Sequence, residues 1–380
     1  MRPILTLLIF TEIIIAFSCT AARNSENKKP FNRLTFLGEY DIPYNMQFQN
    51  TIVGGLSGID YDKENDVYYI ISDDRSEKNP ARFYKVQIFI NNEKIDSVAF
   101  IETIFLKNKN GSFYPGISVD PNQTPDPEAI RYNHLKNSFV WSSEGERIVR
   151  ADKTVLEDPA IIEITGSGNY IDSFILPAQL HMSKEEKGPR RNGAFEGLTF
   201  SNNYKSLFVS MEEPLYNDGL RAGLHDTTGI IRIIKLDVAT KKPVAQYAYT
   251  IDGVAHPPYF PGAFVINGVS DILSVGENKL IVVERSYSTG RLSSTIKIYL
   301  ADLHSAQNIE KNGSLKIDPV KRMVVKRLLL NMDDLGIYID NIEGVCFGPN
   351  LPDGHKTLIF VSDNNFAAIQ KTQFLLFKIE

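Results

Sequence analysis

Acidic residues recur along the chain at a near-constant spacing, which suggests that they meet in one site. Each copy of the pattern begins with a polar residue before a short apolar segment. These residues lie 71, 68, 75 and 72 positions apart: Ser57, Glu128, Glu196, Asp271 and Glu343. A second apolar segment follows in each copy and ends in acidic residues: Asp73, Asp74, Glu144, Glu212, Glu213, Glu284 and Asp363. One such match could arise by chance, but five at this spacing indicate an internal repeat.

Clustered carboxylates repel one another unless a cation or paired bases offset their charge. Oxygen ligands without a His or Cys cluster suit Ca²⁺ or Mg²⁺ and do not suit zinc. We therefore predict a site for a divalent cation, with Ca²⁺ as the favoured ion. The predicted ligands are Asp73, Glu128, Glu144, Glu196, Glu212, Asp271, Glu284, Glu343 and Asp363. Two alternatives remain open: each acidic residue could instead bond to neighbouring backbone, and ion pairs with Arg75 and Arg285 could neutralise the carboxylates without metal.

Two of these residues are also the predicted general bases. Glu196 and Glu343 each precede a glycine, which leaves space beside the carboxylate. Long polar loops supply basic residues near the same place. The guanidinium groups predicted to bind an anionic substrate are those of Arg75, Arg190, Arg191 and Arg285, because such groups beside a carboxylate-bound metal suit a phosphate or another anionic ester. The alternative for each basic residue is a solvated surface position.

Each repeat contains segments with the alternation and β-branched content of strands. In the third copy they span Glu196–Phe200, Leu207–Met211, Ile230–Asp237 and Val244–Ile251. Four antiparallel strands repeated around an axis are typical of a β-propeller, so we predict an all-β fold with five four-stranded blades; a sixth, irregular blade is the alternative. The last copy has three strands, and we expect Arg33–Tyr40 to supply the fourth and close the ring. The first strand of each blade then lines a central channel, and both sets of polar residues gather at one mouth of it.

The N-terminal residues resemble an export signal. Residues 1–18 have a charged start, an apolar middle and small residues before Cys19. The four residues that end in Cys19 resemble a bacterial lipobox, from which Glu12 in the apolar run departs. We expect lipidation of Cys19, a tether over 19–32 and one propeller domain over 33–380, in a cell-envelope lipoprotein that is periplasmic or associated with the outer membrane. Plain secretion is the second choice.

Composition excludes several classes of protein. The chain has 380 residues, of which 43% are hydrophobic, and carries 41 Lys and Arg against 46 Asp and Glu, a formal net charge of −5. A sizeable core can form, and no basic excess attracts nucleic acid. Only two cysteines are present, which excludes a disulfide framework. The sequence has no Walker loop, CxxC pair or GxSxG elbow. We expect a monomer that contacts a membrane only through its lipid.

Several motifs resemble those of the phytase-like domain family, whose members carry the description "esterase-like activity of phytase". The motifs lie at residues 56–59, 72–75, 126–130, 141–144, 192–198, 340–345 and 361–365. The resemblance spans about residues 50 to 380. It implies hydrolysis of ester or phosphoester bonds, and similarity to calcium-dependent propeller phytases implies a metal. It transfers no defined catalytic residue.

Two functions remain open at this stage. One is a metal-assisted hydrolase of phosphate or carboxylic esters, acting on a small anionic substrate at the acidic mouth of the propeller. The other is a surface lipoprotein without enzymatic activity, whose mouth binds a sugar, a peptide or a partner protein. A propeller accommodates both, so the fold cannot decide between them.

Overall fold

The computed structural model describes residues 31–225, 228–276 and 278–380. The predicted signal segment 1–18 and Cys19 lie outside the described residues, as does most of the predicted tether. No helix within the described part of the chain is long and apolar enough to cross a membrane.

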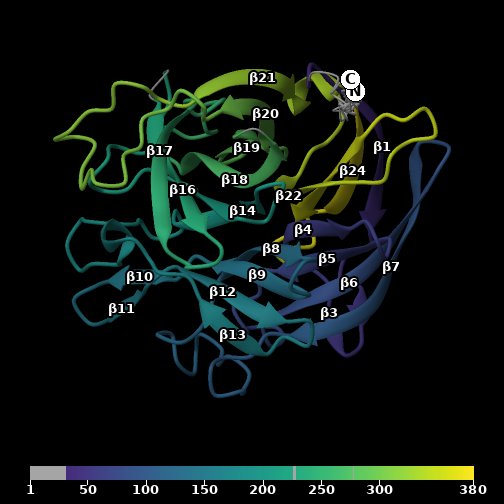
Figure 1. Ribbon diagram of the computed structural model, residues 1–380, viewed down its shortest axis with the longest axis horizontal. Coiled ribbons are helices and arrows are strands. Elements are labelled where there is room, and N and C mark those ends of the chain that lie inside the picture. The colour runs from purple at the N-terminus through teal and green to yellow at the C-terminus, as the bar shows by residue number, and fades with distance from the viewer. Residues whose placement is uncertain (1–30, 226–227, 277) are drawn as a thin grey trace, which may run out of the picture. The chain divides into compact units, whose positions relative to one another are not determined.

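Five four-stranded antiparallel sheets form the blades of a β-propeller, which confirms the predicted fold class (Figure 1). Blade 1 contains β4 (Leu56–Asp62), β5 (Val67–Ser72), β6 (Arg82–Asn91) and β7 (Lys94–Phe105). Blade 2 contains β8 (Pro127–Asn133), β9 (Ser138–Ser143), β12 (Ala160–Thr165) and β13 (Tyr170–Ser173). Blade 3 contains β14 (Phe195–Phe200), β15 (Ser206–Met211), β16 (Gly229–Asp237) and β17 (Pro243–Ile251). Blade 4 contains β18 (Val265–Gly276), β19 (Lys279–Ser288), β20 (Thr295–Asp302) and β21 (Val325–Asn331).

Blade 5 joins the two ends of the described chain. It contains β22 (Asn341–Phe347), β23 (Thr357–Asp363) and β24 (Thr372–Ile379), with β1 (Leu34–Ile42) as its outermost strand. β1 pairs with β24 from Leu34 opposite Ile379 to Ile42 opposite Thr372. The predicted closing strand is therefore confirmed. Closure covers the edge of β24, which would otherwise expose unpaired backbone groups.

Short elements complete the connections. The hairpin β2 (Gln47–Phe48) and β3 (Thr51–Ile52) precedes blade 1, and the hairpin β10 (Glu146–Val149) and β11 (Thr154–Glu157) is inserted into blade 2. Two 3-10 helices, η1 (Ala178–Leu180) and η2 (Met332–Leu335), lie in the loops. Arg285, which was predicted to lie in a polar loop, lies on β19, because this strand continues as far as Ser288.

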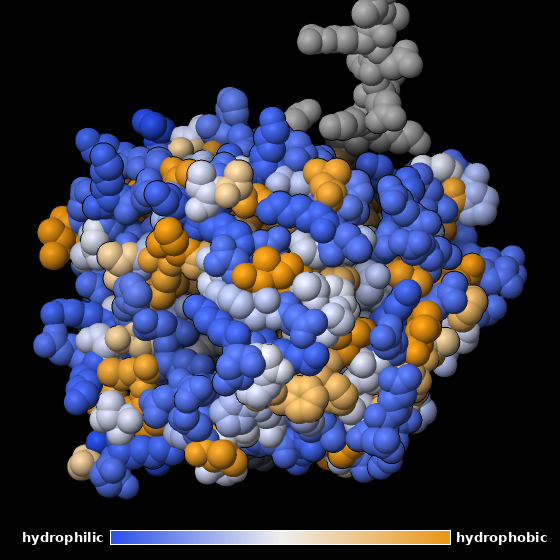
Figure 2. Space-filling view, turned by 60° about the horizontal axis from the view of Figure 1, so that its bottom comes forward, coloured by the Kyte–Doolittle hydropathy of each residue, from blue (hydrophilic) through white to orange (hydrophobic). Residues whose placement is uncertain are grey.

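The core lies between neighbouring blades, where apolar side chains of successive sheets pack together. Leu198 and Phe208 of blade 3 share one buried cluster with Val140 of blade 2 and Ile272 of blade 4. Strands between neighbouring sheets are buried on both faces. β9 and β15 are accordingly buried along almost their whole length. On the face seen in Figure 2, hydrophilic side chains predominate and hydrophobic ones form small separate groups.

A buried ion pair occupies the central channel. Arg131 on β8 donates through Nη2 to both carboxylate oxygens of Asp271 on β18, at 2.9 and 2.8 Å. Its Nη1 donates to the carbonyl of Ile59 in blade 1 at 2.7 Å. Backbone N–H groups of Ile272 and Val345 donate to the Asp271 carboxylate, each at 2.8 Å. The pair therefore connects the inner strands of blades 1, 2, 4 and 5.

Candidate functional site

A β-bulge occurs at the same place in the inner strand of every blade. The pairing between inner and second strands shifts register between Leu56 and Gly58 in blade 1 and between Ile342 and Gly344 in blade 5, and similar shifts occur in the other three. A bulge re-aims a side chain at the end of a strand. The residues at the five bulges are Ser57, Glu128, Glu196, Ser270 and Glu343.

Small residues follow four of these five bulge positions, where neighbouring inner strands approach closely; Asp271 follows the fifth. A Cβ atom at Gly197 would lie 2.5 Å from the Asp271 Cα, and one at Gly58 would lie 2.7 Å from the Ala129 Cα. The glycine after Glu196 is therefore required by packing against the next blade.

A second ring of residues lies where the second strand of each blade ends. The backbone N–H of Asp73 bonds to Gly55, that of Glu144 to Asp126 and that of Glu212 to Ala194. Register places Arg285 opposite Gly268 and Asp363 opposite Asn341. The equivalent residues of the five blades are Asp73, Glu144, Glu212, Arg285 and Asp363. Blade 4 thus contributes an arginine where the other blades contribute a carboxylate.

The sequence analysis assigned Asp271 and Glu284 to these two rings, and the structure places both elsewhere. The predicted alignment of the blade 4 repeat with the other four repeats was displaced by one residue. Successive side chains of a strand point to opposite faces, so this displacement exchanges the faces. Asp271 consequently points into the channel, where it pairs with Arg131. Glu284 accepts hydrogen bonds from the Tyr249 hydroxyl and the Asp252 backbone N–H, each at 2.8 Å. Neither residue lines the central cavity described next.

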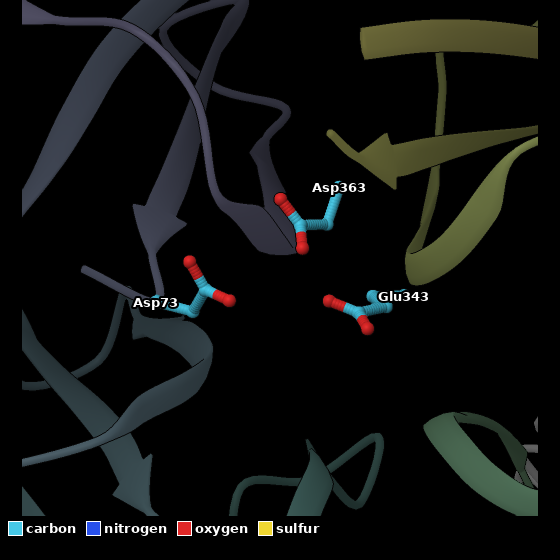
Figure 3. Close-up of side chains that lie close together, drawn as sticks. All are labelled: Asp73, Glu343 and Asp363. Carbon is cyan, nitrogen blue, oxygen red and sulfur yellow. The ribbon is translucent and has the colours of Figure 1, made fainter. Parts of the chain in front are cut away.

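The two rings border a cavity of about 730 Å³, which we call the central cavity. Eight carboxylates and five arginines of the described residues line it. Carboxylate oxygens of Asp73, Glu343 and Asp363 lie within 4.8 Å of one another and face a common space (Figure 3). The same spacing holds for two further groups that share one glutamate: Asp126, Glu128 and Glu144, and Glu144, Glu196 and Glu212.

Several of these carboxylates lack hydrogen-bond donors. Glu128 and Glu196 are 8% and 7% exposed, and among the described residues no group donates to either carboxylate or to that of Asp73. Burial raises the pKa of all three well above the usual range, and nearby carboxylates raise it further. Burial and Asp363 together raise the pKa of Glu343 to about 8. Buried charges without partners are costly, so these carboxylates are suited to a ligand that supplies positive charge.

Arginines interrupt the acidic lining. Arg285 Nη2 lies 2.8 Å from Glu212 Oε1 and 3.6 Å from Glu343 Oε1. Arg75 pairs with Asp126 at 3.4 Å and with Glu146 at 3.2 Å. Within the part of the chain that the structure describes, the buried Nε atoms of Arg75 and Arg285 have no acceptor. The residues that line the cavity therefore include unpartnered donors as well as unpartnered acceptors.

The remaining predicted substrate-binding arginines have different surroundings. Arg191 lines the central cavity and pairs with Glu146 at 2.9 Å. Arg190 lies outside the lining: its Nε donates to the Pro214 carbonyl at 2.8 Å, and its guanidinium stacks 4.2 Å from the Tyr216 ring centroid. Its role is to hold a loop, since backbone and an aromatic ring occupy its guanidinium.

Asp126 and Glu146 were not among the predicted ligands, and Arg221 was not among the predicted substrate-binding residues. Asp126 lies directly before β8, and Glu146 is 1% exposed at the start of the β10–β11 hairpin. Arg221 comes from the loop after β15 and pairs with Glu213 at 2.9 Å. Asp126 stands two residues before Glu128, and Glu146 two residues after Glu144, so their proximity to predicted ligands was the available signal.

The residues present fit a hard divalent cation. The donor set consists of carboxylate oxygens, as Ca²⁺ and Mg²⁺ prefer. Asp363 Oδ2 is a further buried oxygen, to which no group of the described residues donates. Asp73, Glu343 and Asp363 would hold such an ion at one place. Either of the two groups that contain Glu144 would hold it at another: Asp126, Glu128 and Glu144, or Glu144, Glu196 and Glu212.

Comparison with known proteins identifies the family. Residues 51–366 match the phytase-like family, described as "Esterase-like activity of phytase". The chain belongs to the phytase-like family. No functionally curated protein matches this phytase-like chain.

Solved structures resemble the phytase-like chain at low identity. An α-L-arabinofuranosidase from Lactobacillus brevis is 10% identical, with 87% of this chain and 94% of that chain covered and a TM-score of 0.45. An N-acetylgalactosamine deacetylase from F. plautii is also 10% identical, with 92% and 95% covered and a TM-score of 0.44. A gluconolactonase from Xanthomonas campestris is 8% identical, with 91% and 89% covered and a TM-score of 0.36. We draw no functional conclusion from these likenesses.

Proposed function

We propose that the protein is an exported hydrolase of anionic esters, phosphate esters foremost, that acts in the central cavity with the help of a divalent cation. One observation carries the proposal. Carboxylates that accept no hydrogen bond from the described residues line the same cavity as Arg75 and Arg285, whose buried Nε atoms have no acceptor among those residues. A site for a cation alone would need only the carboxylates, whereas a cation together with an anionic substrate would engage both sets.

A bound cation would supply positive charge that polarises the ester and makes water more acidic. The chain's own residues have separate roles. Arg285 and Arg75, which line the cavity, would bind the substrate anion through their guanidinium groups. Hydrolysis requires that a water oxygen bonds to phosphorus, the phosphorus–oxygen bond to the alcohol breaks, and the alcohol leaves with a proton.

Glu196 is the favoured group to accept the proton of the attacking water. Its carboxylate is buried in the cavity lining and accepts no hydrogen bond from the described residues, so its basicity is not reduced by a donor. Glu343 is more constrained, because Asn341 Nδ2 donates to it at 2.7 Å and Arg285 lies nearby. We assign Glu343 to positioning and cation binding, with the general base as its second role.

Turnover of a panel of chromogenic phosphate and acyl esters, with Ca²⁺, Mg²⁺ or EDTA, tests the proposal. We expect phosphate-ester hydrolysis that EDTA abolishes, and a loss of at least 100-fold in kcat for Glu196→Gln. Glu163→Gln is the matched control, because the Glu163 carboxylate bonds to Ser138 at 2.9 Å and to Lys241, outside the cavity lining. Its kcat should stay within about twofold of the wild-type value.

If the folded protein hydrolyses none of the esters with any cation, the hydrolase proposal is wrong. If Glu196→Gln retains wild-type kcat, Glu196 is not the general base. A cavity that binds an anion without turning it over would instead favour the binding module as the function.

A further inference from the structure

One strand pair extends beyond the others at the mouth of the channel. β18 begins at Val265, five residues before its bulge residue Ser270, whereas the inner strands of the other blades begin one or two residues before theirs. At about 3.3 Å per residue, three to four extra residues extend the β18–β19 ladder by about 10–13 Å. Blade 4 therefore forms a wall on one side of the central cavity.

In the extended part of the β18–β19 ladder, beyond Arg285, the side of this wall that faces the cavity carries apolar side chains. Register pairs Gly268 with Arg285 and Ile266 with Tyr287. Residues two apart in a strand share a face, so the face that directs Arg285 towards the carboxylates also presents Ile266 and Tyr287, and both line the cavity. Phe264 adds a third apolar side chain, with its ring centroid 6.4 Å from that of Tyr287.

Two exposed aliphatic residues continue the apolar lining. Leu292, after β19, and Ile369, between β23 and β24, border the same cavity and are 83% and 86% exposed. Large apolar side chains left in water at the border of a charged cavity favour a ligand that covers them. The blade 1 to blade 3 side of the lining is rich in charge, with Arg75, Arg191 and Arg221 among the carboxylates, whereas the charged residues nearest the apolar ones are Arg291, next to Leu292 in sequence, and Asp340.

We propose that the substrate is a phosphomonoester of an apolar alcohol, with an alkyl or aryl group that lies against Ile266, Tyr287, Phe264, Leu292 and Ile369. The inference rests on the proposed function of the same cavity. The phosphate is held near Arg285, and the apolar group follows the blade 4 wall outwards. A polyol carrying many phosphates is a poor fit, since several of its charges would face this wall and lose water without gaining partners.

The experiment compares ethyl, butyl, hexyl and octyl phosphate, below micelle-forming concentrations, with myo-inositol hexakisphosphate as the polar substrate. Burial of a methylene is expected to raise kcat/KM about two- to fourfold, the upper value applying to complete burial. We expect that rise along the alkyl series, and a kcat/KM for inositol hexakisphosphate below that for octyl phosphate. The double variant Leu292→Asn, Ile369→Asn should flatten the series.

Ile317→Asn is the matched control, because Ile317 is 87% exposed and is not among the cavity-lining residues. This variant should keep the chain-length dependence of the wild type. A wild-type series that is flat, or a double variant that behaves like Ile317→Asn, would overturn the inference.

A binding measurement separates this inference from the proposed function. Methylphosphonate and octylphosphonate are not hydrolysed at phosphorus–carbon bonds by water attack, and their affinities can be read from the shift in melting temperature. In one outcome the wild type binds octylphosphonate more tightly than methylphosphonate, with this difference lost in the double variant and no ester turnover. That result would support the apolar binding surface and contradict the hydrolase proposal. Turnover with equal binding of the two phosphonates would keep the hydrolase and refute the wall.

Discussion

Asp271→Asn distinguishes a channel residue from a cation ligand. In the structure both Asp271 carboxylate oxygens accept from Arg131, and two backbone N–H groups complete the arrangement. Removing one partner of a buried ion pair costs about 3–5 kcal/mol, because the other charge is left without compensation. Arg131 is 2% exposed, so water cannot replace the lost carboxylate.

The decrease in melting temperature that corresponds to this loss of free energy depends on the size of the domain. Unfolding entropy is about 2.1 cal/mol/K per residue, or about 0.7 kcal/mol/K for roughly 350 residues. Asp271→Asn should therefore lower the melting temperature of the metal-free protein by about 4–7 °C. Because Asp271 does not line the central cavity, Ca²⁺ should still raise the melting temperature of the variant as it does that of the wild type.

The assay is thermal unfolding with EDTA and with excess Ca²⁺, followed for Asp271→Asn and for Glu196→Gln. The two variants should behave in opposite ways, since Glu196→Gln removes an unpartnered buried acid. We expect it to leave the metal-free melting temperature unchanged or higher and to reduce the response to Ca²⁺. If Asp271→Asn instead keeps the metal-free melting temperature and loses the response to Ca²⁺, the one-residue register of blade 4 is wrong.

Three further predictions concern pH, closure and the N-terminus. Between about pH 4.5 and pH 8 the metal-free protein should lose stability as pH rises. Burial raises the pKa of Glu343 from 4.5 to about 8, so the folded state keeps a proton that the unfolded state has released. Chemical denaturation at stepped pH measures the free energy of unfolding, and an increase across this interval would contradict the prediction. Deletion of 31–42, which removes β1, should cost several kcal/mol by exposing the edge of β24, and an unchanged melting temperature would show that β1 does not stabilise the ring. Cys19→Ala should leave the membrane fraction and lose fatty-acid labelling, whereas a variant that is still labelled would exclude lipidation at Cys19.

The repeat made most of the fold predictable. Five copies of one pattern predicted the number of blades, and the shortage of a strand in the last copy predicted the pairing of β1 with β24. The β10–β11 hairpin was not predicted, because it belongs to one blade only and therefore has no counterpart in the repeat.

The clearest error in the predicted site lies in blade 4. Asp271 was aligned with Glu196 and Glu343 because all three are acidic. The bulge aligns Ser270 with Ser57, and Ser270-Asp271-Ile272 indeed matches Ser57-Gly58-Ile59. This serine match was present in the sequence, but the choice between the two alignments depended on bulge geometry. The same shift replaced Glu284 by Arg285 in the second ring.

Calorimetric titration of EDTA-treated, dialysed protein with CaCl₂ tests the central claim most directly. The carboxylates of Glu128, Glu196 and Asp73 lack donors among the described residues, so they should bind the ion. We predict saturable binding of at least one Ca²⁺ per chain, weakened at least tenfold by Glu196→Gln and unchanged by Glu163→Gln. Absence of binding to the folded wild type would contradict the account, and ion pairs with Arg285 and Arg75 would then be sufficient to balance the carboxylates.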